Sequence, residues 1–437
     1  MKMSRNLIAG VVILGSMLAP LIGQDLEAQI ATAKAAMEAE DWASAQVTWQ
    51  AIVADNPANA EAHYLLSKTA LQTGDLKTAQ TSIAAALEED GRNTEYREHA
   101  DIIAAISSSM TKARRLLDEN DPDGAIAEYE QLLTQHPYLA SAQYAMGMAY
   151  KRTENLRQAA KAFRAARDLD PGNSNYSNAL RNLVAEKYNS ANRLYKNRNW
   201  GPAINAYLEA IDLEPTFHPA YYQLAKAQKY DGDNIAALAT LDKILAFKPD
   251  YVNALVEKGD ILVKEGQEAE AEQAYRLAIS FDAGSDQAYV GLGSILRNTD
   301  ENAAINAFES AIAANNKSSA AHEFLGEIYS GRENWTKAQA HLEKATQLKP
   351  KDYRTAWRLA VVYNSTQNYE QARLMAKKST DIRKSFEYGW YEKGIAEKAL
   401  GNRQAAIVAF RQAEKGRDSA IRKSAKYELA QLTSNGN

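Results

Sequence analysis

Small and apolar residues recur along this chain with a period of 34 residues, in a pattern that predicts two helices per period. Prolines at one place in six periods set the register, which gives eleven repeats between residues 26 and 420. The eighth position is always Ala, Ser or Gly: Ala33, Ser67, Ala113, Gly147, Ala191, Ala225, Gly259, Gly293, Gly326, Ala360 and Gly394. The twentieth position is always Ala: Ala45, Ala79, Ala125, Ala159, Ala203, Ala237, Ala271, Ala304, Ala338, Ala372 and Ala406. The twenty-fourth position is aromatic in seven repeats: Trp49, Tyr129, Phe163, Tyr207, Tyr275, Phe308 and Phe410.

These recurring positions have a physical reason. Two antiparallel helices approach closely only where one of them has little side-chain bulk, so the small residues mark helix crossings. The aromatic residue supplies the apolar surface that fills the gap to the next repeat. Four glycines fall where the first helix of a repeat ends, which predicts left-handed caps: Gly74, Gly232, Gly266 and Gly401. Because one repeat cannot bury its own apolar face, the repeats must stack.

The segments AQYAMGMAYKRTENLRQAAKAFRAARDLDP and AHEFLGEIYSGRENWTKAQAHLEKATQLKP resemble tetratricopeptide repeats. The resemblance covers nearly all of residues 26–420, and the first, second and tenth repeats match least well. It implies an all-α, right-handed superhelical solenoid of about eleven helix-turn-helix repeats whose first helices line a concave groove. It also implies a scaffold or peptide-binding role without enzymatic activity.

Residues 1–23 have the layout of a secretory signal peptide. Lys2 and Arg5 precede an uncharged run over residues 7–23, and the acidic Asp25 follows. Cleavage after residue 23 would release the protein outside the cytoplasm, in the periplasm or cell envelope, or as a secreted protein. The alternative is that this segment stays in place as an N-terminal anchor.

The array is expected to cover residues 24–420, with insertions at residues 94–105 and 174–183. Neither insertion contains Pro or Gly, so each is predicted to continue directly into the next first helix. The insertions would add about 15–18 Å of helix beyond the edge of the array, as a plain extension or as a docking handle. Residues 421–437 are expected to form a capping helix and tail. The apolar face of this helix would consist of Ile421, Ala425, Leu429 and Leu432.

The composition argues against catalysis and metal binding. Without cysteine there are no thiol nucleophiles, disulfides or zinc ribbons, and the six histidines lack the i, i+4 spacing of metal ligands. Residues 119–130 partly imitate a calcium loop, but they begin with Glu119 and end inside a predicted helix. A net charge of −4 is too balanced for a dedicated nucleic-acid binder. We therefore expect no catalytic residues, no metal and no cofactor.

The fifth position of each first helix is predicted to point into the groove, and six of eleven are aromatic. Together with neighbouring ninth and twelfth positions, it gives these expected partner-binding residues: Tyr64, Tyr144, Met148, Tyr188, Asn192, Tyr195, Tyr222, Lys226, Trp357 and Tyr391. Tyr and Trp offer broad contact area at low entropic cost, and Asn can bond to a peptide backbone. The alternative is that the rings only fill the inside of the array. Because no fifth position is Lys, the family's clamp for a C-terminal carboxylate is not expected.

Charge differs between the two ends of the chain. Residues 24–105 have a net charge of −9, and residues 351–437 have a net charge of +8. We interpret the protein as an exported, non-catalytic scaffold that binds a protein or peptide partner through its groove. The alternatives are an envelope component that associates end to end and an accessory protein of polysaccharide export. In these alternatives the basic end would meet anionic lipid, anionic polysaccharide or the acidic end of another copy.

Overall fold

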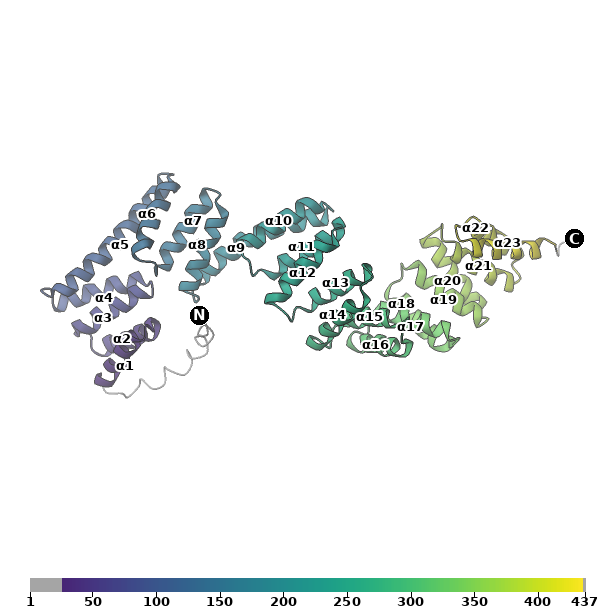
Figure 1. Cartoon of the computed structure of the whole chain (residues 1–437), viewed down its shortest axis with the longest axis horizontal. Helices are drawn as coiled ribbons and strands as arrows, with labels where there is room; N and C mark the ends of the chain where they lie inside the picture. The colour runs from purple at the N-terminus through teal and green to yellow at the C-terminus, as the bar shows by residue number, and fades with distance from the viewer. Residues whose placement is uncertain (1–25, 435–437) are drawn as a thin grey trace. The chain divides into compact units, whose positions relative to one another are not determined.

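The computed structural model describes residues 26–434, which form 23 α-helices and no strand (Figure 1). They make two compact units that divide after Ala220. The helices of the N-terminal unit are α1 (Leu26–Glu38), α2 (Trp42–Asp55), α3 (Ala60–Gln72), α4 (Leu76–Glu89), α5 (Thr94–Asp118), α6 (Pro122–Gln135), α7 (Ala140–Arg152), α8 (Leu156–Leu169), α9 (Ser174–Lys196) and α10 (Trp200–Leu213). Helix α11 (His218–Asp231) crosses the division. Those of the C-terminal unit are α12 (Asn234–Phe247), α13 (Val252–Lys264), α14 (Glu268–Phe281), α15 (Asp286–Leu296), α16 (Glu301–Ala314), α17 (Ser319–Gly331), α18 (Trp335–Leu348), α19 (Tyr353–Ser365), α20 (Tyr369–Ile382), α21 (Glu387–Ala399), α22 (Arg403–Glu414) and α23 (Ser419–Ser434).

Consecutive helices pack in pairs, which is the solenoid of helix-turn-helix repeats that the sequence predicts. The alanines at the twentieth position have no exposed surface in any of the eleven repeats, and the seven aromatic residues at the twenty-fourth are at most 2% exposed. The eighth position meets that ring within the same repeat. A Cβ on Gly147 would lie 2.6 Å from two ring carbons of Phe163, and a Cβ on Gly259 would lie 2.5 Å from the Tyr275 ring. The small residues therefore mark the helix crossings, as predicted.

In ten of the eleven repeats, the turn between the two helices contains one residue in the left-handed region. Gly74, Gly232, Gly266 and Gly401 have φ angles of +77°, +98°, +78° and +78°, which confirms the predicted caps. Six further repeats have other residues at the same position, with φ between +55° and +61°: Glu40, Asn120, Glu154, Arg198, Glu333 and Gln367. At these six positions the packing of the pair holds an L side chain in a conformation that costs about 1–3 kcal/mol.

Each insertion forms the first part of a long helix. Helix α5 has 25 residues and helix α9 has 23, and both run without a break through residues 94–105 and 174–183. Thr94 lies 34 residues after the start of α3, and Ser174 lies 34 residues after the start of α7. Each insertion thus begins where the period requires the next first helix, although no second helix of its own follows it.

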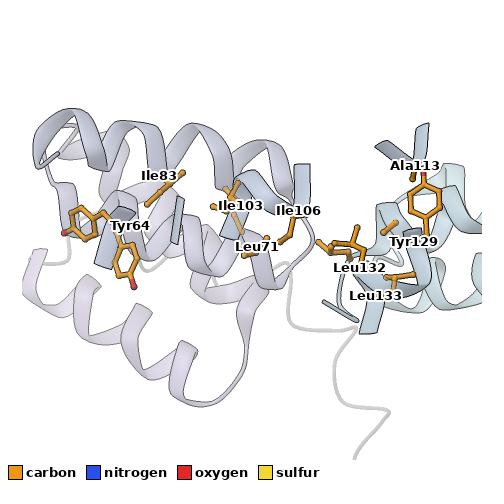
Figure 2. Close-up of a cluster of buried hydrophobic side chains, with 14 of the residues drawn as sticks. Tyr64, Leu71, Ile83, Ile103, Ile106, Ala113, Tyr129, Leu132 and Leu133 are labelled. Atoms are coloured by element: carbon orange, nitrogen blue, oxygen red, sulfur yellow. The ribbon is translucent and has the colours of Figure 1, made fainter. Parts of the chain in front are cut away.

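The inserted segments pack on the pair before them. Tyr96 and Ile103 of α5 are buried in one cluster with residues of α3 and α4, and Tyr176 and Leu180 of α9 are buried likewise. Figure 2 shows Ile103 of α5 near Leu71 of α3 and Ile83 of α4, and Leu132 of α6 belongs to the same cluster. Each long helix therefore serves as a first helix twice, once for the preceding pair and once for its own.

The last helix, α23, covers the final repeat. Ala425 has no exposed surface and packs with Phe410, while Ile421, Leu429 and Leu432 are partly buried beside it. This is the predicted capping helix. The proposed export signal at residues 1–23 lies outside the described residues. Among residues 26–434, no helix is both long enough and apolar enough to span a membrane.

Candidate partner-binding surface

Tyr64 of α3 is almost entirely buried, because the inserted part of α5 covers it. Its ring centroid lies 4.8 Å from that of Tyr96, and its hydroxyl donates a 2.9 Å hydrogen bond to Glu95. Burial and this bond raise the pKa of Tyr64. Lys68 Nζ lies 5.3 Å from the ring centroid, and both residues line a cavity of about 480 Å³ beside Met37 of α1. A partner would meet the rim of this cavity and Lys68 rather than the face of the ring.

Tyr144 of α7 is held in the same way by the second long helix. It is half-buried, with ring centroids 5.7 Å from Phe163 and 5.2 Å from Tyr176. Met148, one turn along α7, is 41% exposed. Tyr188 follows Tyr176 by twelve residues on α9, which is about 18 Å along a helix. The evenly spaced line of tyrosines expected from the sequence is therefore interrupted between Tyr144 and Tyr188, where the inserted part of α9 lies between them.

Tyr188, Asn192 and Tyr195 lie on one side of α9. The Tyr188 ring packs 5.9 Å from Tyr207 and 5.2 Å from Phe217, and Tyr195 packs against Trp200. Asn192 Oδ1 accepts a 2.7 Å hydrogen bond from the Tyr207 hydroxyl. This bond engages the amide oxygen, so the N–H groups of the amide are the ones that can donate to a bound backbone.

The predicted residues of the C-terminal unit lie in two separate groups. On α11, Tyr222 has its ring centroid 5.7 Å from that of Tyr251, and Lys226 Nζ lies 5.3 Å from the Tyr222 centroid. On α19 and α21, each ring packs against aromatic neighbours. Trp357 lies 5.2 Å from Tyr388, and Tyr391 lies 5.7 Å from Phe410, measured between ring centroids. The four predicted residues are half-buried and keep part of their surface accessible: Tyr222, Lys226, Trp357 and Tyr391.

Sequence reasoning did not include a cavity of about 540 Å³ on the first helices α13, α15 and α17. Val256 and Val290, at the fifth position of their repeats, form its apolar part together with Phe324. Asp260 and Ser294, at the ninth position, supply polar groups. Their place at the fifth position predicts that the two valines face the groove. They are absent from the expected binding residues because those were selected for aromatic side chains.

Beside this cavity, a cluster of charged side chains joins α15, α17 and α19. Arg297 Nη1 lies 2.8 Å from Glu327 Oε2, and Arg358 pairs with both Glu327 and Glu323. Burial raises the pKa of Glu323, and Arg358 opposes this rise. Two guanidinium groups balance two carboxylates, so this part of the surface is close to neutral while its charges stay fixed in position.

Candidate metal chemistry has no support in the described residues. Asp121 accepts a 2.9 Å hydrogen bond from the backbone N–H of Gly124 and caps α6, so the partial calcium-loop pattern forms a helix start. Between residues 26 and 434, no group of three or more His, Cys, Asp or Glu side chains is placed to hold an ion.

Comparison with protein families gives matches to repeat models. Residues 36–99 and 116–183 match one model described as tetratricopeptide repeat, and residues 222–288 match a second model with the same description. Both long helices begin within the first two ranges, so the models follow the period across the insertions.

Curated relatives match over short stretches. The tetratricopeptide repeat and J domain-containing co-chaperone DNJ1 of Cryptococcus neoformans is 35% identical over 128 residues, which are 29% of this chain and 24% of the relative. DnaJ homolog subfamily C member 3 of Mus musculus is 34% identical over 74 residues, 17% of this chain and 15% of the relative. The chain thus spans about a quarter or less of these relatives.

The solved structures that are similar to this chain superpose on it with low TM-scores. MamA is 26% identical with a TM-score of 0.33, over 38% of this chain and 91% of that chain. The APC/C hetero-tetramer Cut9-Hcn1 is 15% identical with a TM-score of 0.44, over 95% of this chain and 92% of that chain.

The identification of the repeats rests on the family models and on the packing of the repeats themselves. A buried alanine recurs in all eleven repeats, a buried ring in seven and a left-handed turn in ten. The chain contains tetratricopeptide repeats, which the family models match over residues 36–99, 116–183 and 222–288.

Proposed function

We propose that this protein is an exported, non-catalytic scaffold that binds an extended segment of a partner protein on its first helices. Tetratricopeptide-repeat proteins are scaffolds for protein–protein interaction. The observation that supports the proposal best is the cavity on α13, α15 and α17. Its apolar part, at Val256, Val290 and Phe324, can receive side chains, and Asp260 and Ser294 can bond to a peptide backbone.

In the N-terminal unit, the expected contact is the group formed by Tyr188, Asn192 and Tyr195. The rings are already held by their neighbours, so little conformational entropy is lost when a partner binds. The N–H groups of Asn192 are oriented by the bond that its oxygen accepts from Tyr207. Rigid rings beside an oriented amide suit an extended chain.

The test compares two serine substitutions in the full chain. Ser294 lines the cavity on α15, and Ser280 lies exposed on the second helix α14, and each hydroxyl donates a 2.7 Å bond to a backbone oxygen three residues earlier. Peptides selected from a random library for binding should lose at least tenfold in affinity with Ser294→Trp and change less than twofold with Ser280→Trp. Fluorescence anisotropy measures both. Equal affinities for the two variants would refute a binding role for this cavity.

Export is supported by the order of Lys2, Arg5, the uncharged run over residues 7–23 and the acidic residues after it. Cell fractionation with N-terminal sequencing should recover a protein that begins near Gln24 outside the cytoplasm. Recovery of a cytosolic chain that keeps Met1 would exclude export.

A second candidate is an anionic partner at the C-terminal end. Three successive connections between helix pairs each have two exposed cations: Lys349 and Lys351, Arg383 and Lys384, Lys415 and Arg417. The carboxylates of Asp352 and Asp418 in these connections cap α19 and α23 through backbone N–H groups. The row of cations would suit an anionic polysaccharide, an anionic lipid surface or the acidic end of another copy.

Three measurements test this second candidate. Binding to dextran sulfate or to phosphatidylglycerol vesicles should fall steeply as salt rises. Sedimentation at low and physiological salt tests association between copies. The candidate would be refuted if the protein is monomeric at every concentration and binds neither dextran sulfate nor phosphatidylglycerol vesicles.

A further inference from the structure

Helix α5 leaves one position of the repeat unfilled. Residues 94–105 stand where a first helix is due, and they bury Tyr96 and Ile103 against the preceding pair. In the regular repeats a second helix follows and packs on the first. Here the chain continues along α5, and α6 packs on the other half of α5. The inserted half of α5 is thus a first helix without a second helix.

A groove of about 650 Å³ marks this vacant side, lined by residues of α4 and α5 alone. Ile83 of α4 and Ile103 of α5 form its apolar floor, and Ala100 and Ala104 of α5 allow a close approach of another backbone. The lining on α5 extends from Ala100 to Arg115, which is about 22 Å along the helix. Ten of the eleven second helices in this chain have 14 residues, a length of about 21 Å.

The second long helix provides an internal comparison. At α9 the shorter insertion lets α10 meet α8 directly, and ion pairs close the gap. Arg157 of α8 pairs with Asp212 of α10, while Arg164 and Arg167 pair with Glu214 at the end of α10. Between α4 and α6 the described residues have no ion pair or hydrogen bond. The gap between α4 and α6 is therefore open, whereas the corresponding gap between α8 and α10 is closed by ion pairs.

We infer that the groove between α4 and α5 docks an amphipathic α-helix of a separate partner protein, which takes the place of the missing second helix. In the regular repeats a second helix runs antiparallel to its first helix, so the N-terminus of the docked helix would lie toward Lys112 and Arg115. Lys112 pairs with Glu128 of α6 and Arg115 with Glu119, and both cationic side chains are nevertheless more than half exposed. Acidic residues in the first turn of the partner helix would face these cations and also suit the helix dipole. The partner helix would have about 14 residues, with a small residue followed four positions later by an aromatic one.

The chain itself supplies a probe of this chemistry. Residues 268–281 form a 14-residue second helix with acidic residues in the first turn, a small residue at Ala271 and an aromatic residue at Tyr275. A synthetic peptide of this sequence, held helical by a lactam staple on its polar face, should bind the full-length chain saturably. Tyr275→Ala in the peptide should weaken binding at least fivefold. Absence of saturable binding, or equal binding of the two peptides, would overturn the inference.

Matched substitutions in the protein locate the site. Ala104 lies in the groove and Ala127 lies on α6 outside it, and both are exposed. Ala104→Trp should reduce peptide affinity at least tenfold, whereas Ala127→Trp should change it less than twofold, with unchanged thermal unfolding for both. Equal affinities would place the peptide elsewhere and overturn the inference.

A smaller substitution gives a second readout that avoids added bulk. Because the chain has no cysteine, Ala104→Cys introduces a unique thiol. It should form a disulfide with a peptide carrying one cysteine on its apolar face, and Ala127→Cys should not. A wild-type dimer that Ala104→Trp dissociates would show that the groove holds a second copy of this chain, and would overturn the assignment to a separate partner.

Discussion

One added methyl group at Gly147 tests the packing of the buried ring against the small residue at the eighth position. An ideal Cβ on Gly147 would lie 2.6 Å from Cδ1 and Cε1 of Phe163 and 3.2 Å from the carbonyl oxygen of Ala159. Carbon atoms in contact prefer a separation of about 3.5–4.0 Å, so the ring would have to move by about 1 Å. Phe163 is 1% exposed, so a shift of its ring would have to displace buried neighbours.

Two opposing terms set the expected magnitude. Alanine is favoured over glycine inside a helix by about 1 kcal/mol, whereas overpacking costs about 1–3 kcal/mol. Gly201 of α10 is the matched control, because a Cβ there meets no atom within 4 Å. Gly201→Ala should therefore stabilise its helix pair by up to about 1 kcal/mol, and Gly147→Ala should destabilise its pair by up to about 2 kcal/mol.

Hydrogen–deuterium exchange followed by mass spectrometry resolves the effect by helix pair, which suits an array whose repeats contact mainly their neighbours. Peptides from α7 and α8 should exchange faster in Gly147→Ala, and peptides from α10 should exchange no faster in Gly201→Ala. If both substitutions slow exchange in their own pair, the ring does not fill the crossing and the argument fails.

Three further expectations follow from single contacts. Burial lowers the pKa of His322 and of His341, whose Nδ1 atoms lie 3.1 Å apart. Unfolded imidazoles take up protons first as pH falls below about 6.5, so thermal stability should decrease between about pH 7.5 and 5.5, and less so in His341→Gln. Tyr207→Phe removes the 2.7 Å bond to Asn192 and should cost about 1 kcal/mol in urea unfolding. Gly401→Ala should cost about 1–2 kcal/mol, seen as a lower melting temperature, because its φ of +78° disfavours a side chain although space is open around it.

The fold could be predicted because the same physical constraint acts eleven times. A helix crossing admits only a small residue, so the eighth and twentieth positions reveal each pair in the sequence. The role predicted for the ring at the twenty-fourth position was incomplete. The ring at the twenty-fourth position was expected to fill the gap to the next repeat, and Tyr275 does lie against Gly291 of the next repeat. The same ring also packs against Gly259 of its own repeat, so it joins two crossings at once.

The packing of the two insertions could not be predicted from the sequence. The lack of Pro and Gly correctly predicts continuous helices, but it does not reveal which face of an inserted helix is buried. The period contained that information, since Thr94 and Ser174 each begin 34 residues after an earlier first helix. A register anchored on prolines counts these residues as extra, and so the partners of Tyr64 and Tyr144 could not be identified.

The two long helices also constrain how the N-terminal unit can read a partner. Tyr144 packs on Tyr176, and Tyr188 lies twelve residues further along the same helix, a step of about 18 Å. An extended peptide advances about 3.3 Å per residue, so it needs about five or six residues to cross this step. A partner segment that contacts both tyrosines must therefore place its two anchoring side chains about that far apart, whereas repeats of regular spacing impose no such gap. If the proposed function holds, the insertion in α9 sets the spacing between the two anchoring side chains of a partner that contacts both tyrosines.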